Sequence, residues 1–158
     1  VLASEAERVC KNIQQNIAVA VVDQGGNTLY AHRHESVGPH NLDAAEQKAF
    51  TALSTKTATL ALSQTANSNP DAKNLTTVSK LLLLGGGLPI RYQNQVVGAI
   101  GVAGAGGAKN DDYCATSAIQ ILNFLVLFSA TPTQSVVSFV GNSAFCNQEL
   151  PRSECKMT

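Results

Sequence analysis

The sequence predicts an α+β domain, in which a five-stranded, mainly antiparallel sheet carries helices packed on one face. Two pairs of apolar segments are each joined by a short turn sequence, which is typical of β-hairpins. Segments with helical spacing of apolar residues precede, separate and follow these pairs. The predicted order is therefore helix, two strands, helix, three strands, helix.

The strands follow from apolar runs bounded by turn residues. The first run has no polar interruption, which indicates a strand buried on both faces. The sequence Asp23-Gln24-Gly25-Gly26-Asn27 provides the first hairpin turn and Asn94-Gln95 the second. Three consecutive glycines, Gly85 to Gly87, end the third strand. The predicted strands cover residues 17–22, 28–34, 78–84, 88–93 and 96–103.

The last strand has one face made of small residues. Side chains alternate along a strand, so Val97, Ala99, Gly101 and Ala103 share one face. Glycine weakens a strand unless another group must come close to the backbone. We expect a helix, a second subunit or a flat ligand to lie tightly against this face. The opposite face is predicted to carry Val96, Gly98, Ile100 and Val102.

Three segments have the apolar spacing of amphipathic helices. Residues 2–15 form the first, and residues 42–53 form the second, which is predicted to continue with a kink to residue 63. Residues 111–128 form the last helix, whose apolar positions run nearly all round it. This helix is therefore expected to be buried by the sheet, by another subunit, or by both.

Composition excludes some classes of partner. The chain has 158 residues and a formal net charge of zero, and 14% of its residues are charged. It has no basic patch, so nucleic acid is not an expected partner. The longest apolar run, residues 119–128, is too short to span a bilayer. The chain is long enough to fold as one domain with its own core.

Four cysteines are present and none are spaced as CxxC, which argues against a structural zinc site. We favour the pairs Cys10–Cys114, which would join the first and last helices, and Cys146–Cys155, which would close the tail. An oxidising compartment follows from this interpretation, so the protein is expected to be secreted or periplasmic. The alternative is four free thiols in a cytoplasmic protein.

All three histidines lie within nine residues, at His32, His34 and His40. His32 and His34 are two apart on one predicted strand, so their rings, with that of Tyr30, project to the same side. Such a pair can present two imidazoles to one metal ion, with His40 closing back from the next turn. The alternative is that a solvent-facing strand surface simply carries Tyr, His and His.

Several segments together resemble one family. They are GGGLPI, VVGAIGVAGAGG followed by a pair of aspartates, IAVAVVDQGGNTLYAHRHE, and AAEQKAFTALSTKTATL. In this order they resemble the GlcG/HbpS-like haem-binding family, which includes the C-terminal domain of PduO-type proteins. The resemblance covers residues 1–128 and implies a profilin-like fold. Residues 129–158 lie outside it and are interpreted as a C-terminal extension stapled by Cys146–Cys155.

The resemblance implies haem as the cofactor and a homo-oligomer as the working form. Histidine and tyrosine are used as protein ligands for haem iron. Arginine and lysine suit the haem propionates, and the small-residue face would admit the flat macrocycle. Where the family has Arg-Met-Asp after the second strand, this chain has Arg33-His34-Glu35, which adds a ligand or alters the pocket. The implied axial candidates are Tyr30, His32, His34 and His40, and the implied propionate partners are Arg33 and Lys48.

Lys48 and Thr51 match the Lys-Ala-x-Thr-Ala segment of the family and lie on one face of the predicted helix. They either line the ligand pocket, or Thr51 makes a packing contact and Lys48 is solvated. The main functional hypothesis is haem binding, for sensing, storage or degradation. The alternative is a binding module or enzyme for another small molecule without iron. The chain has no P-loop, HExxH or GxSxG motif.

Overall fold

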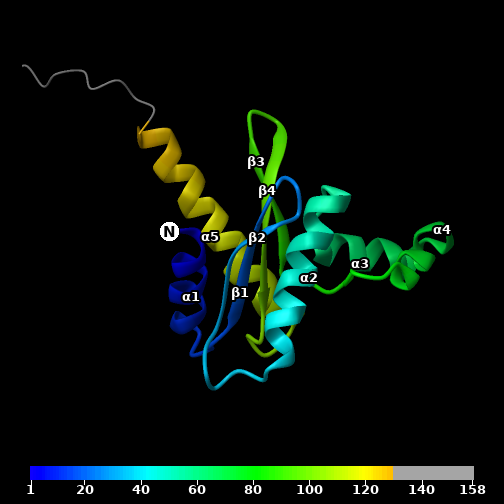
Figure 1. Cartoon of the computed structure of the whole chain (residues 1–158), viewed down its shortest axis with the longest axis horizontal. Helices are drawn as coiled ribbons and strands as arrows, with labels where there is room; N and C mark the ends of the chain where they lie inside the picture. The colour runs from blue at the N-terminus through cyan, green and yellow to red at the C-terminus, as the bar shows by residue number, and fades with distance from the viewer. Residues whose placement is uncertain (130–158) are drawn as a thin grey trace, which may run out of the picture.

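The computed structural model describes residues 1–129, in which helices cover both faces of an antiparallel sheet. In Figure 1, helices α1 and α5 lie side by side against one face of the sheet, and α2 lies against the other. The elements in chain order are α1 (Leu2–Asn12), β1 (Ala18–Asp23), β2 (Thr28–Arg33), α2 (His40–Thr55), α3 (Thr59–Ser68), α4 (Pro70–Lys73), the 3-10 helix η1 (Asn74–Thr77), β3 (Gly87–Tyr92), β4 (Gln95–Ala103) and α5 (Ala108–Ser129).

The sheet has four strands in the order β2-β1-β4-β3, and every neighbouring pair is antiparallel. The predicted α+β class and both predicted hairpins are confirmed. The central strands β1 and β4 are buried along most of their length, whereas β2 is an edge strand with most of its residues exposed. The sheet therefore has a dry centre and one open edge.

The predicted strand at residues 78–84 is wrong, which leaves four strands instead of five. Lys80 has a left-handed backbone (φ 74°), and the N–H of Leu81 donates to the carbonyl of Val78 at 3.2 Å. The N–H of Leu82 donates to the hydroxyl of Thr51 at 2.8 Å. These bonds form a turn held against α2, so the apolar run does not extend along a sheet edge.

The prediction that the helices pack on one face of the sheet is also wrong. Val19, Ile100 and Val102 pack with α1 and α5 on one face. Ala18, Ala20 and Ala103 pack with α2 on the other. Because both central strands carry apolar side chains on both faces, each face needs its own helical cover.

Helix α2 occupies the small-residue face of β4. A Cβ atom on Gly101 would overlap the carbonyl oxygen of Ala45, and one on Gly87 would overlap the carbonyl oxygen of Lys48. The helix backbone thus lies directly on the strands, which only glycine permits. Of the occupants expected for this face, the structure supplies the helix, so no room remains there for a flat macrocycle.

A register shift in the β3–β4 hairpin changes the predicted faces of its outer end. Ile90 pairs with Gly98, but Arg91 pairs with Val96, so Val97 is the extra residue of a β-bulge. Val96 is therefore brought to the face that α2 covers, and Val97 is exposed. The turn itself lies one residue earlier than predicted, at Gln93 and Asn94, both with positive φ.

The second helix ends earlier than predicted, at Thr55. Lys56 then takes a left-handed conformation (φ 54°), and a separate helix, α3, begins at Thr59. Residues 65–73 are largely helical in α3 and α4. These helices lead away from the sheet in Figure 1.

A disulfide joins the two helices on the other face. Cys10 of α1 and Cys114 of α5 are both fully buried, with their Cα atoms 5.5 Å apart. This predicted pair is confirmed. The predicted pair Cys146–Cys155 lies outside the described residues, as does nearly all of the predicted C-terminal extension. No helix within residues 1–129 is long and apolar enough to cross a membrane.

We expect reduction of Cys10–Cys114 to destabilise the fold, because the bond closes a loop with a sequence separation of 104 residues. A loop of this size predicts a loss of roughly 2–5 kcal/mol in the free energy of unfolding. Urea unfolding of the oxidised protein, with and without dithiothreitol, measures this loss. The variant Cys10→Ala/Cys114→Ala should respond to dithiothreitol much less than the parent. An equal response in both would show that the effect comes from elsewhere.

Candidate functional site

A hollow of about 400 Å³ lies between α1 and the edge strand β2. Helix α1 turns its small apolar residues toward the sheet, which leaves its polar residues facing β2. On β2 the period-two alternation places His32 on the same side as α1. The hollow is lined by Ser4, Glu7, Arg8, Lys11, Gln15, Asn16, Ile17, His32 and His34.

His32 has one ring nitrogen engaged and one available. Its Nδ1 lies 2.7 Å from Oε1 of Glu7, and the side chain is 52% exposed. An ionised carboxylate only accepts hydrogen bonds, so the proton of the neutral ring belongs on Nδ1. The lone pair of Nε2 is then free to bind a metal, with Glu7 orienting the ring, as is usual for metal-binding histidines.

His34 has a different arrangement. It follows β2, and its backbone N–H donates to the carbonyl of Ile17 at 3.1 Å. Its Nδ1 accepts the backbone N–H of Ser36 at 3.2 Å and lies 2.8 Å from the Ser36 hydroxyl. An accepting Nδ1 puts the proton of the neutral ring on Nε2. His34 is therefore less ready than His32 to offer Nε2 to a metal.

The other predicted ligands lie elsewhere. Tyr30 is 46% exposed, and its ring centroid is 6.4 Å from that of His32, but it lines a separate hollow beside the start of α1. His40 is exposed at the start of α2. Arg33 donates from Nη1 to the carbonyls of His34, Glu35 and Val37, so its guanidinium holds the turn after β2 together.

The structure does not bring the three histidines into one metal site. Within residues 1–129, no group of three or more His, Cys, Asp or Glu side chains is placed to hold a metal ion. His32 faces α1, whereas His40 begins α2, and these helices cover opposite faces of the sheet. Closeness in sequence did not become closeness in space, because the chain passes from one face to the other between them.

The side chain of Lys48 is buried, with 1% of its surface exposed. It is therefore not solvated, and it does not line the hollow that contains His32. Its Nζ donates to Oδ2 of Asp111 at 2.8 Å and to the carbonyl of Val102 at 2.9 Å. Oδ1 of Asp111 accepts the N–H of Ala105 at 2.8 Å. The sequence predicts Asp111 only as the first residue of the last helix and does not indicate this ion pair. The signal that could have found the pair is a lysine within an alanine-rich buried stripe, which requires a counter-charge.

Thr51 is buried too, and its hydroxyl links elements of the fold. It donates to the carbonyl of Gln47 at 2.7 Å and accepts the N–H of Leu82. Thr51 therefore makes the packing contact that was one of its two predicted roles, and it holds the segment before the three glycines against α2.

Asp112 is the least satisfied carboxylate in the described part of the chain. Its Oδ1 is buried and makes no hydrogen bond among residues 1–129. Burial raises the pKa of Asp112, and the neighbouring charge of Asp111 adds to the increase. The backbone N–H of Gly86 and the charge of Lys48 act in the opposite direction. Asp112 thus sits beside the ion pair with its own charge poorly compensated.

Comparison with known proteins places the chain in a family. Residues 1–120 match the family described as "Haem degrading protein HbpS-like". This chain belongs to the HbpS-like family. The resemblance inferred from the glycine-rich segments is thereby confirmed.

Related proteins and structures agree with this assignment. A 15.0 kDa protein from the dhaT-dhaS intergenic region of Citrobacter freundii is 30% identical over 128 residues, covering 78% of this chain and 88% of that protein. The crystal structure of HbpS has a TM-score of 0.71 at 34% identity, covering 77% of this chain and 84% of that one. A PduOC:heme complex has a TM-score of 0.69 at 27% identity, covering 77% and 89%.

Removing the charge of Asp111 should destabilise the protein strongly. In Asp111→Asn the amide oxygen can still accept the N–H of Ala105, but the ammonium of Lys48 stays buried without a counter-charge. We expect a loss of about 3–5 kcal/mol in the free energy of unfolding, measured by urea denaturation.

Two further variants test the origin of this loss. The double variant Lys48→Met/Asp111→Asn should recover part of the stability, because no buried charge is left alone. Glu5→Gln removes the partly exposed partner of Arg8, which lies 2.8 Å away, and should cost less than about 1 kcal/mol. A double variant no more stable than Asp111→Asn would argue against this account.

The variant Asp112→Asn should stabilise the protein at neutral pH. Burial raises the pKa of Asp112 in the folded state. The free energy of unfolding therefore decreases as the pH rises from the unfolded to the folded pKa, and the loss is complete above the folded pKa. Below the ordinary value of 3.8 the carboxyl is neutral in the folded and the unfolded protein, and the charge no longer contributes to the stability difference between parent and variant. Denaturation of parent and variant at pH 7, 5.5 and 4 should show a gap that narrows as the pH falls. A gap independent of pH would contradict this.

Proposed function

We propose that this chain binds haem at the hollow between α1 and β2, with Nε2 of His32 as the axial ligand. The observation that supports the proposal most directly is the 2.7 Å contact between Nδ1 of His32 and Glu7, which leaves Nε2 free. Membership of the HbpS-like family, which is described as haem-degrading, and the likeness to the PduOC:heme complex support haem as the bound group.

The residues present fit haem in charge and polarity. Arg8 and Lys11 line the same hollow as His32 and supply two cations for the propionates. Arg8 also pairs with Glu5 at 2.8 Å, so Lys11 has the less engaged charge. His34 lies at the same hollow and offers a second imidazole once its ring is reoriented.

The side chain of His32 is half exposed at this hollow, so we infer that a second copy of the chain covers the bound haem in a homo-oligomer. Exposed apolar side chains near the edge strand and at the end of α5 support self-association; Leu29 is 68% exposed and Leu127 is 70% exposed. Sedimentation velocity of the same samples before and after haem addition measures this part of the proposal.

Bound haem supplies iron-centred redox and ligand chemistry. The protein's contribution is to hold the iron through His32, to keep that ring oriented through Glu7, and to neutralise the propionates. This arrangement serves sensing, storage or degradation of haem. We further propose an oxidising compartment, secreted or periplasmic, because the buried Cys10–Cys114 bond persists where thiols are not kept reduced.

Titration of the untagged protein with haemin should give a saturable Soret shift. His32→Ala should abolish the sharp shift, because it removes the axial nitrogen. Glu7→Gln should weaken binding by roughly tenfold, since the ring loses its carboxylate partner. His40→Ala is the matched control and should bind as the parent does.

The other outcomes are also informative. An unchanged titration for His32→Ala, with loss in His34→Ala or Tyr30→Ala, would move the iron to another residue and contradict the proposed ligand. If the parent protein shows no saturable Soret shift, the proposal of haem binding is wrong. Decay of the Soret band under ascorbate, faster than that of free haemin, would identify degradation as the role.

A further inference from the structure

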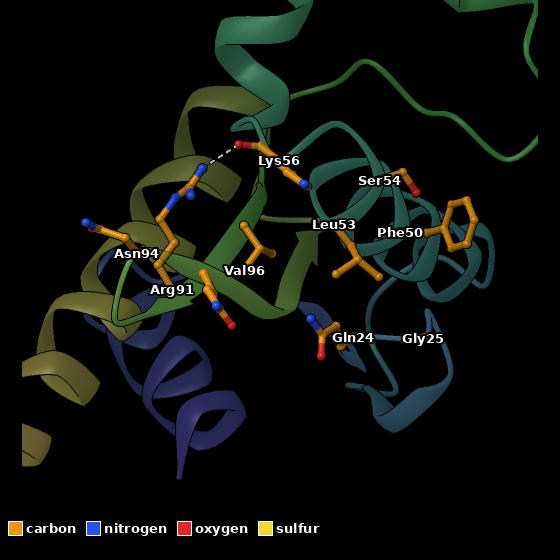
Figure 2. A pocket seen from close by; sticks show the side chains of 10 residues that line it. Gln24, Gly25, Phe50, Leu53, Ser54, Lys56, Arg91, Asn94 and Val96 are labelled. Atoms are coloured by element: carbon orange, nitrogen blue, oxygen red, sulfur yellow. Dashed lines mark hydrogen bonds between the residues drawn. The ribbon is translucent and has the colours of Figure 1, made fainter.

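A second, larger hollow of about 590 Å³ lies beside the C-terminal end of α2. None of the ligand-binding residues predicted from the sequence lines it. Figure 2 shows it between the β3–β4 hairpin, the end of α2 and the β1–β2 turn. It lies on the face of the sheet opposite α1, so it is separate from the histidine hollow. It is lined by Gln24, Gly25, Phe50, Leu53, Ser54, Lys56, Arg91, Asn94, Gln95 and Val96.

The charged side chains of this hollow are all cationic. Lys56 and Arg91 line it, and no acidic side chain among residues 1–129 does so. The acid nearest in sequence, Asp23, is held in the hairpin turn, where it accepts hydrogen bonds from Gly25 and Asn27. Those bonds lower the pKa of Asp23, with the Asn27 side chain contributing most. The lining therefore has a net positive charge without an internal counter-ion.

The uncharged lining divides into polar and apolar parts. Side-chain amides and a hydroxyl come from Gln24, Ser54, Asn94 and Gln95, and these can donate hydrogen bonds to an anion. Apolar surface comes from Phe50, Leu53 and Val96. Small-molecule sites commonly combine an apolar lining with a few polar groups that fix orientation, at volumes of roughly 300–1,000 Å³.

Backbone features position the two cations. Lys56 takes the left-handed conformation that ends α2, and its carbonyl accepts a 2.7 Å hydrogen bond from Nη2 of Arg91 (Figure 2). Arg91 lies on the α2 side because side chains alternate along β3 from Gly87, which packs against α2, and the bulge at Val97 in β4 brings its partner Val96 to the same side. The guanidinium is thus anchored to the helix end through one nitrogen.

The neighbouring surface adds a further cation. Nζ of Lys80 lies 5.8 Å from the centroid of the Phe50 ring, which forms part of the apolar lining. Lys80 and Phe50 also border a smaller hollow that contains the carboxylate of Glu46. Glu46 accepts a 3.1 Å bond from the hydroxyl of Thr28, and it does not line the larger hollow. Glu46 thus shares the smaller hollow with Lys80 and is not part of the larger one.

We propose that the larger hollow binds a small organic anion, with its carboxylate or phosphate held between Lys56 and Arg91. The apolar body of the ligand lies against Phe50 and Leu53. The chemistry shared by both anion types is a set of negatively charged oxygens, which a guanidinium and an ammonium recognise through charge-assisted hydrogen bonds. The proposal does not depend on haem, because the two hollows share no residue.

Nitrogen-15 chemical-shift titration of the haem-free chain tests this site. The probes are phenyl phosphate, benzoate and inorganic phosphate, with benzyl alcohol as the neutral counterpart. We expect saturable shifts at the amides of residues 54–56 and 91–96 with phenyl phosphate or benzoate, and none with benzyl alcohol. Phenyl phosphate and benzoate share the aromatic ring, so their relative affinities distinguish a phosphate ligand from a carboxylate ligand.

Matched variants locate the binding. Arg91→Gln and Lys56→Asn should each weaken it by roughly tenfold or more, because each removes one charge-assisted contact. Asparagine tolerates the left-handed conformation at position 56, so that variant should fold. Arg91→Lys should retain part of the affinity, and Lys73→Gln, which removes an exposed cation outside the hollow, should retain all of it.

The proposal is overturned if no anion binds, if benzyl alcohol binds as well as benzoate, or if Arg91→Gln and Lys73→Gln behave alike. The haem proposal is tested separately by His32→Ala, which should leave anion binding unchanged. Loss of both activities in His32→Ala would mean that the two hollows are not independent.

Discussion

The buried ion pair between Lys48 and Asp111 connects all three layers of this protein. Lys48 belongs to α2 on one face of the sheet, Asp111 belongs to the first turn of α5, and the carbonyl of Val102 in β4 lies between them. Each polar atom of the pair has a partner, which a buried charge requires. Gly86 lies directly against Val102 and Asp111, and a Cβ atom at this position would overlap both. The three-glycine segment therefore packs against the same ion pair, which requires glycine at position 86.

Close packing around this pair confines ligand binding to the margins of the fold. Helix α2 lies directly on Gly101 and Gly87, and α1 and α5 cover the opposite face and are joined by Cys10–Cys114. The centre of the sheet therefore has no space for a ligand. Space remains at the edge strand β2 and at the outer ends of the hairpins, where the helices no longer cover the strands.

The two hollows differ in chemistry because different helix features border them. The histidine hollow is bordered by the polar stripe of α1, which supplies a carboxylate and two cations beside an imidazole. The cationic hollow is bordered by the end of α2, where Lys56 reverses the chain and Arg91 binds its carbonyl. For this reason we propose haem as the ligand of the first and a small anion as the ligand of the second.

Local sequence patterns determined the hairpins, the three main helices and the family resemblance, whereas the Cys10–Cys114 pair was only favoured over free thiols. Turn chemistry and the spacing of apolar residues act over a few neighbouring positions, so they can be recognised without knowing the fold. The tertiary structure decided which segments meet. Only it showed that residues 78–84 bond to Thr51 instead of a sheet edge, and that the bulge at Val97 turns Val96 toward α2.

The same distinction applies to the candidate site. The sequence alone indicated that His32 and His34 share one side of a strand, and that Lys48 and Thr51 share one side of a helix. It could not show that Glu7, 25 residues before His32, would orient that ring, or that Asp111, 63 residues after Lys48, would neutralise its charge. These contacts depend on how the helices cover the two faces of the sheet, and no local pattern encodes that arrangement.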